Sequence, residues 1–409
     1  MNMHRFYFTL ILVLSWPLRF FPFCMLHALG RALGSCVYVC VPKFRKRALS
    51  NLSLATSLHL SNGEIRRYAK ESLQNLMITC LEYAKFASLK TMKGVAICVN
   101  PETAQGLIDK GTAVIFFCGH LANWEVLFLE GTERMKGVAI GRPIKNIPLY
   151  NWVVKIREKF GGKIIAPKNA IREGLRGLKQ GNFLGIVGDQ GMPDSGFCSP
   201  FLGRKAWSSP MAAILSHRTG APIIVATTKR EKGKYLIHYS DPLWPDKDAP
   251  MQQEVERLMK LALLPLEKTI QENPGQWLWS HNRWKQQTPD KLKKTFRQES
   301  ILIILPKEGL EAIVEHLPQF RAFYPHEFIT IYAPEGAEVE LEEAEIVPYK
   351  APQDLFKEDY RFKLVFNFTP IETLNTHFKK LAAFTAVSLK GGPSLPELLN
   401  TLILKSDAS

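Results

Sequence analysis

From residue 111 onward, short apolar runs alternate with longer segments of helical periodicity, and this alternation constrains the fold more than any other feature. Apolar runs of about four to eight residues between turn signals are typical of buried strands, whereas longer segments with an apolar stripe are typical of helices. The order predicts an α/β sandwich around a mainly parallel or mixed sheet. Strands are expected at 113–118, 137–140, 163–166, 183–188 and 222–228, and helices at 121–135, 147–160, 169–179, 207–219 and 251–272. A further helix is expected before this region, at 61–90.

The charge of the chain changes sign near residue 295, which indicates two modules. Of the formal net charge of +15 over 409 residues, residues 1–294 contribute +21 and residues 295–409 contribute −6. After a linker expected at 286–296, a small α/β module of unknown role is predicted at 297–409, with strands at 301–305, 328–332, 345–347 and 364–368 and a helix near 310–317. The basic part favours anionic partners such as a phospholipid surface, a phosphorylated lipid or an acidic carrier protein. Nucleic acid is not expected as a partner, because no nucleic-acid motif is present.

Residues 1–42 are predicted to be a membrane anchor. The chain is strongly apolar from Phe6 to Val41, with an interruption at Pro17. The run before Pro17 is shorter than the roughly 20 residues of a simple span, so the segment could cross the membrane, dip into one leaflet or lie at the interface. A signal peptide is the competing interpretation, but no clean small-residue cleavage site follows. A basic cluster comes next, at Lys43, Arg45, Lys46 and Arg47. By the positive-inside rule, this cluster predicts that the bulk of the protein is on the cytoplasmic side.

The first strand of the alternating region leads directly into a histidine. The run 113–118 is followed by Gly119-His120, and Glu125 comes five residues after the histidine. A histidine whose second ring nitrogen is held by a carboxylate is oriented to take a proton from a hydroxyl. Residues five apart on a helix point about 140° away from each other. The pair can therefore meet only if His120 lies at the strand-to-helix turn and Glu125 in the first turns of the helix.

Further blocks accompany this pair in a fixed order. They are Arg47-Ala48 with Asn51-Leu52, Arg142-Pro143, Asn146, Arg157, Gly161-Gly162, Val187-Gly188-Asp189-Gln190, Pro200-Phe201-Leu202-Gly203-Arg204-Lys205-Ala206, His217-Arg218-Thr219-Gly220-Ala221-Pro222-Ile223, and Pro274-Gly275-Gln276-Trp277-Leu278-Trp279-Ser280-His281-Asn282-Arg283-Trp284-Lys285. In this order the chain resembles the bacterial lipid A secondary acyltransferases, the lauroyl/myristoyl transferase family, over roughly residues 1–287. The resemblance implies an acyltransferase domain at 43–287 with a glycerol-phosphate-acyltransferase-like α/β sandwich.

The resemblance also implies a reaction. The family moves an acyl chain from acyl carrier protein to the hydroxyl of a 3-hydroxyacyl chain on a Kdo-lipid A precursor, at the cytoplasmic face of the bacterial inner membrane. His120 would be the general base, Glu125 would orient its imidazole, and Arg157 would stabilise the oxyanion or bind a phosphate. No metal or redox cofactor is expected, because the thioester is already activated. Acyl transfer to an alcohol independently requires a base, an oxyanion partner and a dry slot for the chain.

Five other residues are candidates for substrate binding. Asp189 and Gln190 end a predicted strand, where polar residues often line an α/β site, although an ordinary turn reads the same way. Arg204 and Lys205 are cations that fit a phosphate or an acidic carrier, and a solvated loop is the simpler alternative. Arg142 belongs to the same family pattern. Cys118, two residues before the histidine, is expected to be a buried strand thiol rather than an acyl-enzyme nucleophile.

Alternative functions remain open from the sequence. Glycerol-phosphate acyltransferases usually carry H-x4-D and a later Phe-Pro-Glu-Gly block, and the acid here is Glu125 with no such block, which weakens a phosphatidic-acid role. The acceptor could instead be another glycolipid, such as an acylated inositol mannoside, or a lysophospholipid. The protein could also be a catalytically inert membrane scaffold of the same fold, or its C-terminal module could bind a nucleotide or sugar.

Overall fold

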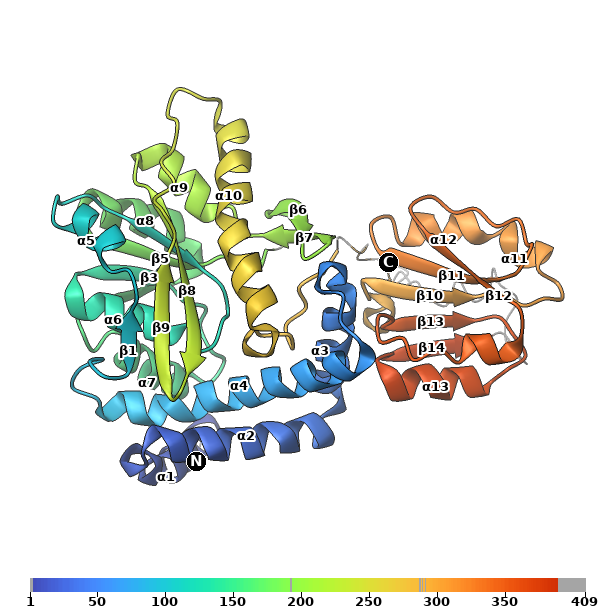
Figure 1. The fold of residues 1–409 in the computed structure, drawn as a ribbon, viewed down its shortest axis with the longest axis horizontal. Helices are drawn as coiled ribbons and strands as arrows, with labels where there is room; N and C mark the ends of the chain where they lie inside the picture. Colours follow the sequence, from blue (N-terminus) through green and yellow to red (C-terminus); the bar gives the residue numbers. More distant parts are fainter. Residues whose placement is uncertain (1–2, 192, 287, 289, 291, 389–409) are drawn as a thin grey trace, which may run out of the picture. The chain divides into compact units, whose positions relative to one another are not determined.

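The computed structural model describes residues 3–388 apart from 192, 287, 289 and 291 (Figure 1). Its contacts divide the chain into two compact units, each built from two stretches of sequence. The first unit comprises Met1–Tyr38 and Lys70–Leu278, and the second comprises Val39–Ala69 and Trp279–Ser409. The units do not follow the bounds expected at 42, 287 and 297, because part of the expected acyltransferase domain groups with the C-terminal module.

The first unit is built on a mixed sheet of seven strands, as the alternating pattern predicted. The strands lie in the order β1-β9-β8-β2-β5-β3-β4, and every neighbouring pair is parallel except β8 and β9. Their bounds are β1 Ala96–Cys98, β2 Ile115–Cys118, β3 Gly137–Ile140, β4 Lys163–Ile165, β5 Phe183–Val187, β8 Ile223–Glu231 and β9 Lys234–Tyr239. The sequence pattern found β2, β3, β4, β5 and β8, and it missed the short β1 and the half-polar β9.

Helices cover both faces of this sheet (Figure 1). Successive residues of β5 show the two faces, because Phe183 lies against Gly131 of α6 while Leu184 lies against Gly174 of α8. Helices α9 and α10 share the face of α8, and α4, α6 and α7 form a common core with β9 on the other. The bounds are α4 Asn62–Ser88, α5 Glu102–Ile108, α6 Glu125–Arg134, α7 Ile147–Arg157, α8 Ala170–Lys179, α9 Met211–Thr219 and α10 Met251–Glu272. The fold class is therefore the predicted α/β sandwich.

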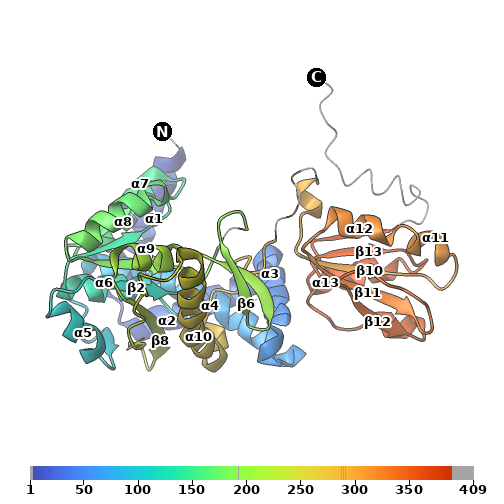
Figure 2. The same cartoon turned by 90° about the horizontal axis from the view of Figure 1, so that it is seen from above.

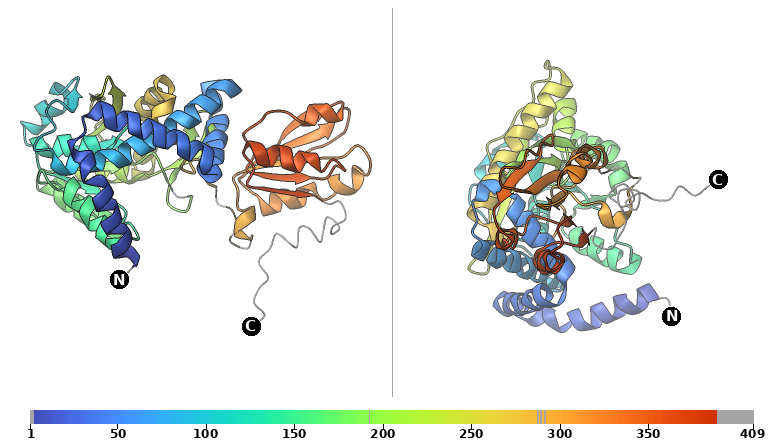
Figure 3. Two further views of the ribbon diagram at one scale, coloured as in Figure 1. Left: turned by 90° about the horizontal axis from the view of Figure 1, so that it is seen from below. Right: turned by 90° about the vertical axis from the view of Figure 1, so that its right-hand side faces the viewer.

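The N-terminal apolar segment forms two helices that meet at Pro17. Helix α1 spans Met3–Ser15, the 3-10 turn η1 spans Pro17–Phe20, and α2 spans Phe23–Cys40. Helix α1 lies beside α7 (Figure 2), and α2 runs along α4 (Figure 3). In the described part of the chain, α2 is the one helix long and apolar enough to cross a membrane, although 22% of that window is buried in the protein.

An antiparallel hairpin lies outside the main sheet of the first unit. It consists of β6 Phe197–Phe201 and β7 Arg204–Ser208. Leu202 and Gly203 join the strands with φ values of 51° and 88°. Two consecutive positive φ angles are typical of the tight turns that match the twist of a hairpin. The first residues of the helix expected at 207–219 therefore belong to a strand, and α9 starts only at Met211.

The second unit contains the predicted C-terminal α/β module. Its five strands are all parallel and lie in the order β12-β11-β10-β13-β14, so the chain adds strands outward on both sides of β10. Side chains of β10 alternate between two cores: Ile301 and Ile303 pack with α11 and α12, whereas Leu302 and Ile304 pack with α13. The bounds are β10 Ser300–Ile304, α11 Glu311–Val314, α12 Leu317–Phe323, β11 Phe328–Pro334, β12 Glu345–Tyr349, β13 Leu364–Asn367, α13 Thr373–Leu381 and β14 Thr385–Ser388.

A buried ion pair joins this module to helix α3, Pro42–Leu54. Lys363 and Glu299, both almost fully buried, lie at the amino ends of the neighbouring strands β13 and β10 and form a salt bridge. The Lys363 ammonium also donates to Asn51 of α3 at 3.0 Å and to Asn282 at 2.8 Å. These hydrogen bonds connect α3 and Asn282 to the module, and all three belong to the same compact unit. The buried charges of Lys363 and Glu299 are compensated by these partners. Leu292, inside the expected linker, is likewise buried in the module core.

We predict that Lys363→Met destabilises the second unit by about 3–5 kcal/mol, because it leaves the Glu299 carboxylate buried without its cation. Hydrogen–deuterium exchange of β10 and β13 amides in the intact protein measures this loss. The matched control is Lys350→Met, whose exposed pair with Glu335 should be worth less than about 1 kcal/mol. Equal exchange rates in the two variants would contradict a structural role for the buried pair.

Candidate active site

His120 lies at the carboxyl edge of the first unit's sheet, in the loop between β2 and α6. Because β2 ends at Cys118 and α6 begins at Glu125, the histidine occupies the predicted strand-to-helix turn. The neighbouring strand β5 is parallel to β2, so residues that follow the two strands emerge at the same edge. Asp189 follows β5 as His120 follows β2. The two side chains meet there, with Nδ1 of His120 2.8 Å from Oδ1 of Asp189.

The Asp189 carboxylate is fully buried and accepts three hydrogen bonds. In addition to Nδ1 of His120, the backbone N–H of His120 and the indole N–H of Trp277 each donate to Oδ2 at 2.9 Å. Burial would raise the pKa of Asp189, but the charge interaction with His120 and these hydrogen bonds lower it to about 2. An ionised carboxylate can only accept. His120 therefore carries a proton on Nδ1, and in the neutral imidazole the lone pair is on Nε2.

Two residues of the loop, Gly119 and Trp124, help to position the imidazole of His120 beside the Asp189 carboxylate. A Cβ added to Gly119 would lie 3.1 Å from the Asp189 carboxylate and 2.7 Å from a methyl carbon of Leu266, so glycine leaves room for the carboxylate. The ring of Trp124 packs edge-to-face on the imidazole of His120 at 4.6 Å between centroids. The imidazole is thus held by its hydrogen bond to Asp189 and by its contact with the Trp124 ring.

The backbone of the loop is fixed at Ala122, which has a φ of 44°. This left-handed conformation is uncommon for a residue other than glycine and persists where the surroundings determine it. The Ala122 carbonyl accepts hydrogen bonds from Asn75 at 2.8 Å and Thr79 at 3.2 Å, and its N–H donates to the Gln276 carbonyl at 2.7 Å. Helix α4 and the segment after α10 therefore clamp the turn that presents His120.

A buried glutamate extends this support to the N-terminal helix α2. Glu82 of α4 accepts a hydrogen bond from Asn123 at 2.7 Å, directly beside the loop, and from the Tyr235 hydroxyl at 2.5 Å. Its other carboxylate oxygen lies 2.7 Å from Nε2 of His27 in α2. Glu82 therefore links the apolar helix α2, the core helix α4 and the loop of the candidate active site in one polar network.

Glu125 has a different partner from the one that its spacing predicted. It does begin α6, as the geometric condition required, but its carboxylate forms a bidentate pair with Arg157, at 2.7 Å to Nε and 2.5 Å to Nη2. Arg157 also donates to the Tyr83 hydroxyl at 3.0 Å. The acid on Nδ1 of His120 is Asp189, not Glu125. Glu125 does not reach the imidazole because, as the first residue of α6, it points toward the end of α7, where Arg157 lies.

Arg157 is held as a charged and oriented group. Burial lowers the pKa of its guanidinium, but the adjacent Glu125 carboxylate more than offsets this and raises the pKa above its usual value. A Cβ built on Gly141, at the carboxyl end of β3, would lie 3.4 Å from Nη1 of Arg157. The guanidinium therefore reaches the same edge of the sheet as the histidine.

The structure distributes the remaining candidate residues around this edge. Arg142 is exposed two residues after β3, and Gln190 is half-buried next to Asp189. Arg204 and Lys205 lie on β7. The carboxyl end of β7 is joined to the loop that carries Asp189, because the Gly191 N–H donates to the Trp207 carbonyl and the Ser209 N–H donates to the Gly188 carbonyl. The sequence reasoning missed Trp277 as a partner of Asp189 and the supporting residues Tyr83, Glu82, Asn75 and Thr79. From the sequence, Trp277 stood out only as part of the block at 274–285 that carries the family resemblance.

Cys118 is a buried strand thiol, as expected. Burial raises the pKa of its Sγ, which points to the Ile186 carbonyl at 3.6 Å, so a thiolate nucleophile is not favoured at this position. Among the residues that the structure describes, no group of three or more His, Cys, Asp or Glu side chains is placed to hold a metal ion.

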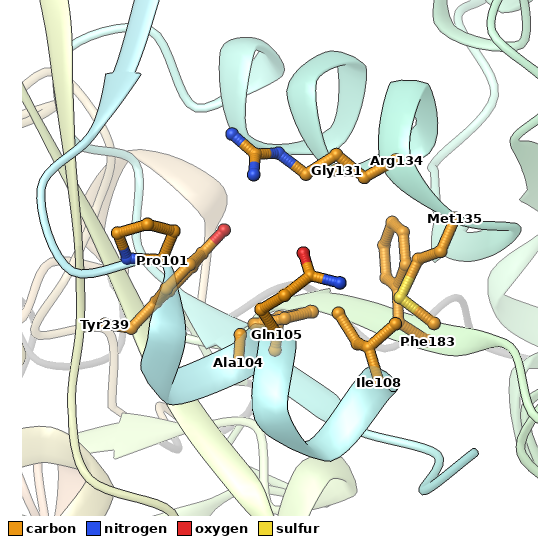
Figure 4. Close-up of a pocket in the computed structure, with 10 residues that line it drawn as sticks. Pro101, Ala104, Gln105, Ile108, Gly131, Arg134, Met135, Phe183 and Tyr239 are labelled. Atoms are coloured by element: carbon orange, nitrogen blue, oxygen red, sulfur yellow. The ribbon is translucent and has the colours of Figure 1, made fainter. Parts of the chain in front are cut away.

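A small cavity of about 20 Å³ lies elsewhere in this unit, between α5, α6 and the sheet (Figure 4). Phe183, Ile108 and Met135 make its lining mostly apolar, and Arg134 and Gln105 add polar groups. His120 does not line this cavity.

An α/β sandwich with a carboxylate-bound histidine at the carboxyl edge of its sheet has the form of an enzyme that transfers protons. The model of a protein family described as bacterial lipid A biosynthesis acyltransferase matches residues 2–286 of the chain. The chain therefore belongs to this family, which confirms the resemblance seen in the sequence and indicates an acyltransferase. Residues 287–409, which include the whole C-terminal module at 297–409, lie outside the match.

Among solved structures, the chain is similar to a 1-acyl-sn-glycerophosphate (LPA) acyltransferase, PlsC, from Thermotoga maritima. The two are 16% identical over 60% of this chain and 95% of that chain, with a TM-score of 0.29. A comparison with curated protein sequences found no match.

We predict that Asp189 stabilises the fold by about 2 kcal/mol above pH 4, because its pKa falls from the ordinary 3.8 to about 2 on folding. A depressed carboxyl pKa contributes stability that is present above the unfolded pKa and is lost as the pH falls through the folded pKa. About half of it should be gone at pH 3. Urea unfolding of wild type and Asp189→Asn at pH 5 and pH 3 measures the change, with the exposed Asp109→Asn as control. A wild type-to-variant difference that is the same at both pH values would contradict the assignment.

Proposed function

We propose that the protein transfers an acyl chain from acyl carrier protein to the hydroxyl of a 3-hydroxyacyl chain on a Kdo-lipid A precursor. The observation that carries the proposal is the His120–Asp189 pair at the sheet edge of a chain that belongs to the lipid A acyltransferase family. The acyl carrier protein donor and the particular acceptor come from the family resemblance. The paired histidine supplies the base that transfer to an alcohol requires.

In this proposal Nε2 of His120 takes the proton from the acceptor hydroxyl. The resulting oxygen nucleophile attacks the thioester carbonyl carbon, and a tetrahedral intermediate with a negative oxygen forms. When the intermediate collapses, the carbon–sulfur bond breaks and the carrier thiolate leaves. The imidazolium returns its proton to that thiolate, so the protons balance. Asp189 is a positioning residue, because it fixes the Nδ1–H tautomer and stabilises the imidazolium without touching the substrate.

Arg157 is the proposed partner of the developing oxyanion or of an acceptor phosphate. Its bidentate pair with Glu125 fixes the plane of the guanidinium, and planar guanidinium groups suit phosphate and oxyanion geometry. Glu125 thus acts through Arg157, in place of the role on the imidazole that its spacing had suggested. Arg142, Gln190, Arg204 and Lys205 are proposed to bind the phosphate-bearing acceptor or the acidic carrier, because they lie on loops and strands around this edge.

The proposed site of action is the cytoplasmic face of the bacterial inner membrane. Its support is the apolar helix α2 together with the basic residues that follow it at 43–47. A phosphorylated, multiply acylated acceptor is itself a membrane lipid, so an attached enzyme meets it without extracting it into water.

A transfer assay with purified protein in detergent tests the proposal. Wild type should add the mass of one acyl chain to a tetra-acylated Kdo-lipid A precursor when given acyl-carrier-protein thioesters of several lengths. His120→Ala and Asp189→Asn should each lower the rate by on the order of 10²–10⁴, because both remove an oriented base. His238→Ala, at an exposed position of β9, is the matched control and should transfer at the wild-type rate.

The outcomes separate the alternatives. Transfer only to a lysophospholipid or an inositol mannoside would keep the chemistry and reject the lipid A acceptor. A folded wild type that transfers to none of these acceptors would reject the enzyme and favour a scaffold. Normal transfer by His120→Ala would reject the mechanism.

A further inference from the structure

Helix α2 is attached along one side to the polar helix α4. A Cβ added to Gly30 would lie 2.8 Å from the Ile78 Cα, and one added to Gly34 would lie 2.2 Å from the Gln74 Cα. At its amino-terminal end, His27 forms the buried contact with Glu82. Because residues 27 and 34 of α2 meet residues 82 and 74 of α4, the two helices run antiparallel. Helix α2 therefore lies along the surface of the first unit instead of projecting from it (Figure 1).

Helix α1, which precedes the turn at Pro17, also packs on the first unit. It packs beside α7, and Asn146 at the start of α7 donates to the His4 carbonyl at 2.9 Å (Figure 2). A helix of 18 residues is about 27 Å long, close to the roughly 30 Å hydrocarbon core of a bilayer. If α2 crossed a bilayer and the sheet with its helices stayed on one side, α1 would be at the opposite membrane surface from α7. Their contact requires both ends of α2 to be on one side.

The outward surface of α1 and α2 is apolar and basic. None of the residues of α1 is buried, and large apolar side chains are widely exposed at Met3, Phe6, Tyr7, Leu10, Ile11, Val13, Leu14, Trp16, Phe20, Met25, Leu33 and Val39. The chain has no acidic residue before Glu64, and this surface carries Arg5, Arg19 and Arg31. Arg19 lies over the ring of Trp16 at 5.0 Å. Aromatic and basic residues beside exposed aliphatic ones are typical of helices that lie in a membrane interface.

We propose that α1 and α2 together attach the protein to one leaflet of an anionic bilayer, lying in the membrane plane without crossing it. The apolar side chains enter the acyl region, and the arginines meet lipid phosphates. The same helices reach the candidate active site, because α2 is tied to its loop through Glu82 and α1 contacts α7, which ends at Arg157. The inference rests on the proposed membrane attachment, and it fails separately from the proposed reaction because transfer in detergent needs no bilayer.

The first test determines on which side of the membrane each end of the anchor lies. A polar tag with a protease site is placed before Met1, and in a second protein the same site is placed in the exposed β8–β9 turn at Lys232-Gly233. Inside-out and right-side-out vesicles of bacterial inner membrane are then treated with the protease. In-plane attachment predicts that both sites are cut from the same side. Cleavage of the N-terminal site only from the opposite side, or from both sides, would overturn the proposal.

The second test identifies the bilayer as the occupant of this surface. Purified full-length protein is floated with phosphatidylcholine vesicles with and without phosphatidylglycerol. Leu10→Ser with Leu14→Ser should lower vesicle affinity at least about tenfold for each leucine, and binding should increase with the anionic lipid. The matched control replaces two exposed leucines of α10, Leu261→Ser with Leu264→Ser, and should bind as wild type. Equal loss in both pairs, or a dimer that binds no vesicles, would reject the bilayer as the occupant.

Discussion

The candidate active site depends on one buried charge, the Asp189 carboxylate. Taking a carboxylate out of water is expensive, and the protein compensates with an imidazole, an indole N–H and a backbone N–H. These three donors come from the loop after β2 and from the segment after α10, so Asp189 fixes the relative positions of both with respect to β5. The orientation of His120 follows from that arrangement. Gly119 and the left-handed Ala122 are the local adjustments that allow the loop to reach the carboxylate.

The two acidic residues near the histidine have separate positions and separate partners. Asp189 is bound to the imidazole, whereas Glu125 is bound to a guanidinium and shares Arg157 with the Tyr83 hydroxyl. Both carboxylates are buried, so neither can lose its partner without a large penalty. The arrangement thus presents a base and a cation at one sheet edge, each held by its own acid. A reaction that removes a proton and then develops a negative oxygen needs both groups.

The sequence alone predicted the alternation of β2 to β5 with α6 to α8 and the turn that carries His120, because these depend on local periodicity and a nearby glycine. It did not predict the partner of His120. The pairing with Asp189 joins residues 69 apart, and it arises only because β5 lies beside β2 in the sheet. Strand order is decided by packing over the whole unit, so a five-residue spacing could suggest Glu125 but could not exclude Asp189. The three-residue β1 and the hairpin β6–β7 were missed because such short segments carry little periodic signal.

The second unit shows the same dependence on distant contacts. Asn51 and the Trp279–Lys285 segment belong to the stretch matched by the acyltransferase family, yet they pack with the module that lies outside the match. Asn51 binds Lys363 and also donates to the Trp279 carbonyl, so a side chain of the family region completes a buried cluster of the module. A junction between independent domains would be expected to run through exposed, polar sequence. Here the junction is buried and charged, and the module is therefore part of how the α3 region folds in this chain.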